Sequence, residues 1–317
     1  MKKIFAILLA VLVLTTGFSA CTPAPKPADN AKTVGLIQLV EHPSLDEIRI
    51  AITEELNAKA AEQGLTVEIN YQNAQNDMSM INSICRQFVS DKVDVIIAIA
   101  TPAAQGAATA TSDIPVIFSA VTDPVAAGLV TDMSAPDGNV TGTSDAIAVE
   151  RIFNLAQELT PGIAKFGFIY NKGESNSVSV IGQAADYLAG VGIATEEKTV
   201  TSAGEVQQAA RVLFETCDAV FAPIDNTVAS SMQVLADEAI AAGKPVYVAA
   251  DSMVADGGLA TVGVNYTQLG KQTADMALRA LTGTAIADMP VEVLTEVSVA
   301  VNAETAAALG VDVSQYE

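Results

Sequence analysis

The chain has 317 residues, of which 37 are acidic and 16 basic, and its formal net charge at pH 7 is −21. Such a surface repels nucleic acid and anionic lipid head groups, so neither is expected as a partner. The length exceeds what one modest core usually serves and favours two lobes. A single histidine, with no CxxC motif, leaves a transition metal without a visible set of ligands.

The first 21 residues have the layout of an export signal. A basic start at residues 1–3 precedes an apolar run over residues 4–14, which is too short to span a membrane. The string that ends at Cys21 resembles a bacterial lipobox, which implies that residues 1–20 are removed and that Cys21 carries lipid such as palmitate. Residues 21–32 are rich in Pro and Ala and predict an extended linker. We therefore expect an extracytoplasmic, lipid-anchored domain at the cell surface or in the periplasm.

From residue 33 onward, apolar strands alternate with amphipathic helices. The strands of the first half are predicted over residues 33–40, 65–72, 94–100 and 114–121, with helices over 45–64, 77–89 and from 102. The second half predicts strands over residues 165–171, 193–200, 218–224, 245–250 and 259–264, with helices over 177–190, 203–214 and 227–242. A helix over 265–283 and a strand over 291–302 follow. This alternation implies βαβ units and parallel sheets.

The two halves repeat one plan, because DVIIAIATPAA followed by IPVIFSAVTDP parallels DAVFAPIDNTVA followed by KPVYVAADS. The sequence therefore predicts an α/β receptor with two lobes, a hinge of several strands and a ligand between the lobes. Lobe 1 is predicted over residues 33–143 and about 266–287, and lobe 2 over residues 144–265 and about 288–317. Cys85 and Cys217 then lie in different lobes, and we expect both to be buried free thiols.

Polar turns follow the strands, and in parallel sheets a ligand lies beyond the carboxyl ends of the strands. Six turns are rich in acids, hydroxyls and amides, and they cover residues 41–46, 101–105, 121–124, 171–177, 225–227 and 250–252. Lys172 is their only basic residue, so a ligand carboxylate is expected at helix N-termini. A ligand ammonium is expected at the acids Glu41, Asp123, Asp225 and Asp251. For each acid alone, a capping or turn-forming role is an equally good interpretation.

Three rings are further candidates for ligand contact. His42 lacks a nearby nucleophile, so hydrogen bonding to or stacking on a ligand is favoured over catalysis, and so is a surface position without a role. Tyr170 and Tyr266 follow strands and are expected either to stack on a planar ligand or to line a strand end. No GxSxG, Walker, GxGxxG or HExxH motif occurs, so no catalytic residue and no cofactor is predicted.

Eight ordered segments carry a family resemblance: EHPSLD, YQNAQND, IATPAAQ, AVTDPVAAGLV, GNVTG, IYNKGESNSV, DNTVASSM and VGVNYTQLGKQTADMA. Over about residues 33–311 the chain resembles the substrate-binding lipoproteins of ABC importers in the tryptophan/tyrosine or uncharacterised-substrate family. The resemblance implies a type I periplasmic-binding-protein fold, hinge closure around a small ligand such as an aromatic amino acid, and delivery to a permease and its ATPase. It also implies a binding role for Glu41, His42, Pro43, Thr101, Pro102, Thr122, Asp123, Glu174, Ser175, Asn176, Ser177, Asp225, Asn226 and Thr227.

The sequence thus predicts a monomeric, non-enzymatic receptor that closes on an amino-acid-like ligand. The alternatives are a nucleoside, purine or sugar receptor of the same fold, a secreted α/β hydrolase or lyase, and the sensing domain of a membrane receptor kinase. As part of this interpretation, Asp225→Ala is expected to weaken binding tenfold or more and to leave the stability of the ligand-free protein nearly unchanged.

Overall fold

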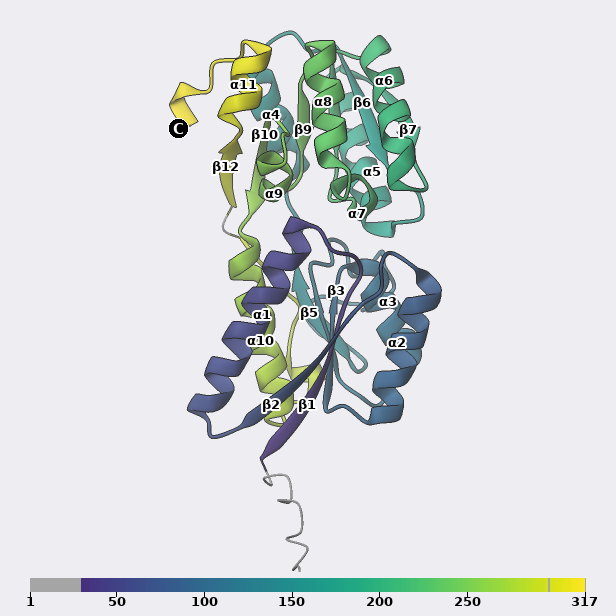
Figure 1. Ribbon diagram of the computed structural model, residues 1–317, viewed down its shortest axis with the longest axis vertical. Coiled ribbons are helices and arrows are strands. Elements are labelled where there is room, and N and C mark those ends of the chain that lie inside the picture. The colour runs from purple at the N-terminus through teal and green to yellow at the C-terminus, as the bar shows by residue number, and fades with distance from the viewer. Residues whose placement is uncertain (1–29, 296, 317) are drawn as a thin grey trace, which may run out of the picture.

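Two α/β lobes stacked along the long axis form the molecule (Figure 1). The computed structural model describes residues 30–295 and 297–316, so the predicted signal peptide and Cys21 lie outside the described residues. Each lobe is built on a six-stranded sheet. Within the described residues no helix combines the length and the apolar character that crossing a bilayer requires.

The first lobe contains most of the N-terminal half. Its elements are β1 (Ala31–Gln38), α1 (Pro43–Glu62), β2 (Thr66–Asn73), α2 (Met78–Asp91), β3 (Val95–Ile99), α3 (Thr101–Ala110), β4 (Val116–Ser119) and β5 (Val140–Ser144), joined later in the chain by α10 (Tyr266–Leu281) and β11 (Glu292–Val293). The sheet order is β11-β5-β4-β3-β1-β2, with every pairing parallel. Helices α1 and α10 cover one face of this sheet, and α2 and α3 cover the other (Figure 1).

The second lobe repeats this plan. Its elements are α4 (Val149–Leu159), β6 (Lys165–Tyr170), α5 (Ser175–Gly190), β7 (Ala194–Thr199), α6 (Val206–Thr216), β8 (Ala219–Ala222), α7 (Asn226–Ala229), α8 (Met232–Ala242), β9 (Val246–Val248), α9 (Asp251–Ala255), β10 (Ala260–Val264), β12 (Val297–Val301) and α11 (Ala303–Leu309). The sheet order is β12-β10-β9-β8-β6-β7. Among the strands of this sheet that the structure describes, β12 alone runs antiparallel to its neighbour.

The chain passes between the lobes three times, after β5, after β10 and after β11. The single strand predicted over residues 291–302 is in fact two strands, one in each sheet. Strand β11 still belongs to the first sheet, a few residues beyond the boundary near 288 that the sequence suggested. An apolar run of this length can serve two sheets, and periodicity alone does not reveal the passage between them.

Other differences are local. Strand β1 begins at Ala31, inside the predicted linker, because it pairs with β2 from that residue onward. The helix predicted over 227–242 divides into α7 and α8 at Ser230 and Ser231. The expectation for the two thiols is confirmed, since Cys85 and Cys217 are both buried and free. Burial raises the pKa of the Cys85 thiol to about 11, so it stays protonated at neutral pH.

A close approach of α1 and α10 depends on Gly270. A methyl group there would lie 2.7 Å from both the Ala51 Cβ and the Ile48 carbonyl oxygen. We expect Gly270→Ala to lower the free energy of unfolding by about 1–3 kcal/mol, because the two helices must move apart. Gly182→Ala in α5 is the matched control, since its methyl group would meet no atom within 4 Å and should stabilise the helix slightly. Chemical denaturation of both variants checks this; equal stabilities would contradict it.

Candidate ligand-binding site

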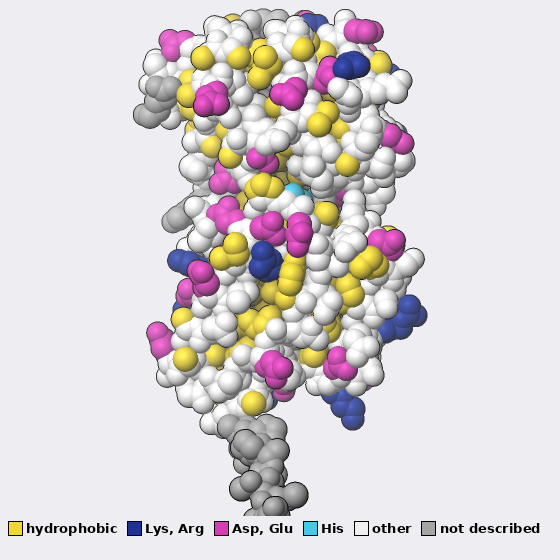
Figure 2. Space-filling model, in the orientation of Figure 1, with side chains coloured by type: hydrophobic (Ala, Val, Ile, Leu, Met, Phe, Trp, Pro, Cys, Tyr) yellow, Lys and Arg dark blue, Asp and Glu magenta, His cyan; other side chains and the backbone are white. Residues whose placement is uncertain are grey.

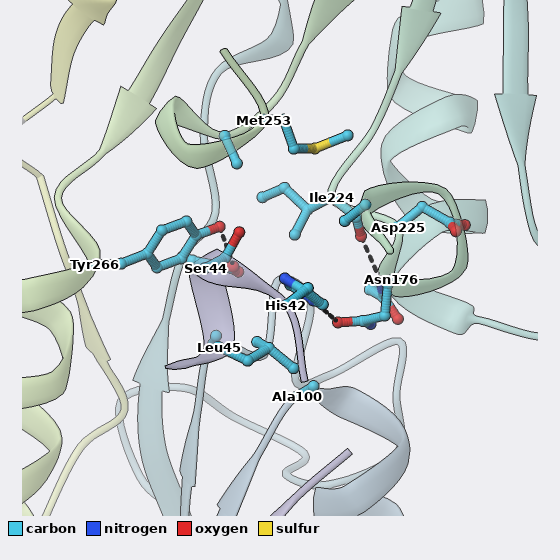
Figure 3. Close-up of a pocket in the computed structure, with 14 residues that line it drawn as sticks. His42, Ser44, Leu45, Ala100, Asn176, Ile224, Asp225, Met253 and Tyr266 are labelled. Carbon is cyan, nitrogen blue, oxygen red and sulfur yellow. Dashed lines mark hydrogen bonds between the residues drawn. The ribbon is translucent and has the colours of Figure 1, made fainter. Parts of the chain in front are cut away.

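The carboxyl ends of the two sheets face each other where the lobes meet, and a small cavity lies between them (Figure 3). Its volume is about 10 Å³, the space of roughly one water molecule. The lining comes from both lobes and from two of the passages between them, and it consists of His42, Ser44, Leu45, Ala100, Ala120, Asp145, Asn176, Ile224, Asp225, Asn226, Ala229, Ala250, Met253 and Tyr266.

The lobes are closed on each other through hydrogen bonds between turns and helices of the two lobes. These bonds join His42 Nε2 to Asn226 Oδ1 at 3.2 Å, Asn76 Nδ2 to Thr227 Oγ1 at 3.4 Å, Ser179 Oγ to Asp123 Oδ2 at 2.7 Å, and the hydroxyls of Ser44 and Ser252. Each pair takes one residue from each lobe. The closed arrangement is therefore stabilised by polar contacts around the cavity.

Glu174 organises the second lobe's side of the site. Its carboxylate is 3% exposed and accepts four hydrogen bonds. Oε2 accepts from the backbone N–H and the side-chain Nδ2 of Asn226, at 2.9 and 2.6 Å, and Oε1 accepts from the backbone N–H and Oγ1 of Thr227, at 3.0 and 2.9 Å. Glu174 thus holds the first turn of α7 in place.

Asp225 is the N-cap of α7 and is buried. Its Oδ1 accepts from the Val228 backbone N–H at 2.9 Å, and its Oδ2 accepts from the Asn171 backbone N–H and the Ser177 hydroxyl, each at 2.7 Å. Burial, together with the nearby Glu174 charge, raises the pKa of Asp225 to about 7. Because these three donors belong to its own lobe, the structure argues against the expectation that Asp225→Ala leaves stability unchanged.

Asp145 and Tyr266 link two of the passages between the lobes. Asp145 directly follows β5, and Tyr266 opens α10. The Tyr266 hydroxyl donates to Asp145 Oδ2 at 3.3 Å, and the Thr122 hydroxyl donates to Oδ1 at 2.9 Å. Asp145 is fully buried, and this burial raises its pKa to about 6. The sequence reasoning missed Asp145 because VTGTS was not recognised as a strand; the strand-end rule would otherwise have found it.

Unsatisfied polar atoms gather in these turns. Among the described residues, six buried side-chain polar atoms lack a hydrogen-bond partner, and four belong to inter-lobe turns: His42 Nδ1, Thr101 Oγ1, Ser175 Oγ and Asn176 Oδ1. Buried polar atoms in folded proteins are almost always paired, and an unpaired one costs about 1–3 kcal/mol. The arrangement is suited to a polar ligand that supplies the missing partners.

Two alanines in the cavity wall adopt a backbone conformation that favours glycine. Ala100 follows β3 with φ of 79°, and Ala120 follows β4 with φ of 55°. A residue with a side chain adopts this left-handed region at some cost, and such strain concentrates at binding sites. The two neighbouring strands therefore each end in a strained alanine that borders the cavity.

The structure brings only some of the predicted site residues to the cavity. His42, Asn176, Asp225, Asn226 and Tyr266 line it. A second group lies buried behind the lining and consists of Thr101, Pro102, Thr122, Glu174, Ser177 and Thr227. Glu41 and Pro43 are exposed and border a second groove instead, which they share with His42 and with residues 229–234 of the second lobe.

The remaining predicted residues do not line the cavity either: Asp123 accepts from Ser179 of the other lobe, and Ser175 opens α5. The Tyr170 hydroxyl donates to Glu197 of β7 at 2.7 Å, and its ring packs in the core of the second lobe, away from the cavity. Asp251 accepts from the backbone N–H of Ser252, the next residue, at 2.8 Å. Sequence reasoning missed the apolar part of the lining, Leu45, Ile224 and Met253, because these side chains resemble ordinary core residues.

The surface around the site is acidic. Figure 2 shows more acidic than basic side chains on the visible face, with several acids near the boundary between the lobes. The lining within the described residues contains two carboxylates, Asp145 and Asp225, and no Lys or Arg. A ligand with a positive group suits this lining better than a phosphate does.

The comparisons with known proteins agree with this geometry. Residues 33–316 match the family model of the ABC transporter substrate binding proteins. A tyrosine-binding protein from Clostridioides difficile is 38% identical over 97% of this chain and 92% of the relative. The fold is the type I periplasmic-binding-protein fold, because solved proteins of this kind superpose over nearly the whole chain.

Two solved structures are informative about the lobe arrangement. An ABC domain from Streptococcus pneumoniae in complex with L-Trp is 36% identical, with 89% of this chain and 96% of that chain covered and a TM-score of 0.85. A ligand-free, open substrate-binding protein from Clostridium difficile is 40% identical, with 89% and 95% covered, yet its TM-score is 0.69. The lobe arrangement is therefore nearer to that of the L-Trp complex. With the family match over residues 33–316, these findings show that the chain belongs to the family of ABC transporter substrate-binding proteins.

Proposed function

We propose that this substrate-binding protein captures an aromatic amino acid between its lobes and delivers it to a membrane permease and ATPase for import. The observation that carries the proposal is the meeting of buried acids and unpartnered polar atoms from both lobes at one cavity. The tyrosine-binding relative and the L-Trp complex of a similar protein support the ligand class. Because the family binds substrates for transport, the chain is not an enzyme, and the hydrolase alternative is set aside.

The two charged ends of an amino acid have separate partners in this proposal. The ammonium binds Asp145, a fully buried carboxylate with only two side-chain donors. The carboxylate binds at the N-termini of α3 and α5. The unpartnered hydroxyls of Thr101 and Ser175 there lie outside the present lining and can donate to the carboxylate once the lining side chains shift. The ring lies among Leu45, Ile224 and Met253.

Binding requires movement of the lobes. A cavity of about 10 Å³ is far below the several hundred Å³ typical of ligand pockets, so the lobes must part and the lining side chains must shift to admit an amino acid. A ligand favours the closed state only through contacts it makes with both lobes at once. The lipobox-like residues before Cys21 support a lipid-anchored, extracytoplasmic location, and we propose that the protein acts as a monomer.

A thermal-shift screen tests the ligand class. The chain from residue 22 onward, unfolded and refolded to remove bound ligand, is screened against amino acids, nucleosides and sugars. Ligand at a thousand times its dissociation constant adds about 4 kcal/mol of stability, which raises the melting temperature visibly. We expect shifts with aromatic amino acids. A shift with a nucleoside, purine or sugar alone would keep the fold and replace the proposed ligand.

A further inference from the structure

We propose that His42 determines which aromatic amino acid is bound, by accepting a hydrogen bond at Nδ1 from a donor on the ligand side chain. This proposal rests on the proposed function. It names the ligand class more narrowly, as aromatic amino acids with an indole N–H or a phenol O–H, and it excludes phenylalanine as a tight ligand. The role of His42 follows from a chain of contacts that runs from Glu174 through Asn226 to the imidazole ring.

Glu174 determines the orientation of the Asn226 side-chain amide. Glu174 Oε2 already accepts from the Asn226 backbone N–H, so the Asn226 side-chain group that lies 2.6 Å from this oxygen is the NH₂ group. The amide oxygen of Asn226 therefore points the other way, toward the first lobe. There it lies 3.2 Å from His42 Nε2.

The contact with Asn226 determines which nitrogen of the His42 imidazole carries the hydrogen. Because Asn226 Oδ1 is an acceptor, His42 Nε2 must carry the hydrogen of this bond. Burial lowers the pKa of His42, although Asn226 and the nearby Glu174, Asp46 and Asp256 act in the opposite direction. The ring is therefore neutral at pH 7, and Nδ1 is left with a lone pair and no hydrogen.

The other imidazole nitrogen of His42, Nδ1, lacks a hydrogen-bond donor within the described part of the chain. This atom is buried and has no hydrogen-bond partner among the described residues. His42 is 7% exposed, so bulk water has little access to Nδ1 and does not replace a protein donor there. In Figure 3 the His42 ring lies in the middle of the lining side chains. A donor on a ligand in this cavity would remove the cost of the unpaired acceptor.

The ligand ammonium is better matched elsewhere. A buried positive charge needs a negative partner, and Asp145 in the same lining supplies one. The Tyr266 hydroxyl, which donates to Asp145, and Asn176 lie on opposite sides of His42 in Figure 3. The neutral Nδ1 acceptor is therefore available for a neutral donor on the ring of the ligand. Indole and phenol carry such a donor, and the phenylalanine ring carries none.

Nuclear magnetic resonance tests the state of the ring. His42 is the only histidine in the chain, so labelling with ¹⁵N-histidine, in protein purified without a histidine tag, gives an assignment without further work. We expect a neutral ring protonated at Nε2, and a change in the Nδ1 resonance when tyrosine or tryptophan is added. A ring protonated at Nδ1, or a ring charged at pH 7, would overturn the proposal.

Calorimetry with matched ligands tests the selectivity. The pairs are tyrosine with phenylalanine, and tryptophan with 3-benzothienylalanine, in which sulfur replaces the N–H group. We expect the donor-bearing member to bind at least about 10-fold to 100-fold more tightly. His42→Phe should reduce this ratio to near one. Met253→Leu, which changes an apolar lining residue, should alter both affinities and leave the ratio unchanged.

The outcomes separate this proposal from the function on which it rests. If no aromatic amino acid binds, the proposed function fails. If all of them bind with similar affinities, or if the ratio survives in His42→Phe, the function stands and the role of His42 is overturned.

Discussion

Replacement of Asp145 by asparagine is expected to weaken amino-acid binding by about 100-fold or more and to make the ligand-free protein more stable at pH 8. Binding weakens because a buried ammonium loses its carboxylate partner, a loss that costs about 3–5 kcal/mol in buried ion pairs. Stability rises because the wild-type protein must bury the charge of Asp145, whose side chain is fully enclosed. The variant thus exchanges function for stability.

The pH dependence has a definite sign. Burial raises the Asp145 pKa to about 6 in the folded state from an ordinary value of 3.8, so between these values the folded protein holds more protons than the unfolded protein. The free energy of unfolding that Asp145 contributes therefore falls as pH rises from about 4 to about 6, and it is level above that. A rise of about two units in the Asp145 pKa means that the ionised side chain destabilises the folded wild-type protein by about 3 kcal/mol. Asparagine removes this cost but has one acceptor oxygen fewer, and the lost hydrogen bond takes back about 1 kcal/mol.

Denaturation at several pH values checks the stability, and calorimetry checks the affinity. The stability advantage of Asp145→Asn should be small near pH 4 and reach about 2 kcal/mol above pH 6. Asp113→Asn, at an exposed position of the first lobe, is the control and should change neither quantity. An Asp145→Asn protein that binds its ligand normally would show that the ammonium is held elsewhere.

Asp225→Ala is expected to lower the free energy of unfolding by about 2–4 kcal/mol, in contrast to the expectation from sequence alone. The substitution removes the N-cap of α7 and leaves the half-buried Asn171 N–H and the buried Ser177 hydroxyl without their acceptor. Relief of the repulsion with Glu174 offsets part of this loss. Ligand binding should also weaken tenfold or more, because Asp225 shapes the cavity wall.

Asp225→Asn provides the comparison for this variant. It keeps the shape and one acceptor oxygen, so its unfolding free energy should lie between those of wild type and Asp225→Ala. Thermal and chemical denaturation of the ligand-free proteins measure both differences. If Asp225→Ala unfolds at the wild-type midpoint, the hydrogen bonds to Asp225 contribute nothing net to the fold.

Most of the fold follows from sequence because buried parallel strands have a clear signature. Strands β1, β3 and β4 each contain Val and Ile or Leu in a short apolar stretch between polar turns, and sequence reasoning places them within a few residues. Strand β5 has no such signature, because VTGTS contains two threonines, a serine and Gly142. Its hydroxyls are buried by tertiary partners, among them Thr273 of α10, which no local pattern reveals.

The turns of the site can be predicted from sequence, because ligands of parallel sheets lie beyond the carboxyl ends of the strands. The direction of each side chain in those turns cannot be predicted in this way. Tyr170 and Asp225 both lie at or just after strand ends, yet Tyr170 turns toward Glu197 and only Asp225 reaches the cavity. This difference depends on partners in neighbouring strands and turns, which are distant in sequence. The hydrogen bonds that connect Glu174 through Asn226 to His42 join the two lobes, so they can be recognised only when the lobes are placed together.

A crystal structure of the refolded protein with L-tryptophan tests the central claim most directly. The account predicts one amino acid between the lobes, in contact with both, with its ammonium at Asp145 and its indole N–H at His42. It also predicts a cavity enlarged well beyond about 10 Å³ by movement of Met253 and its neighbours. Tryptophan bound outside the inter-lobe site, or touching one lobe only, would contradict the account.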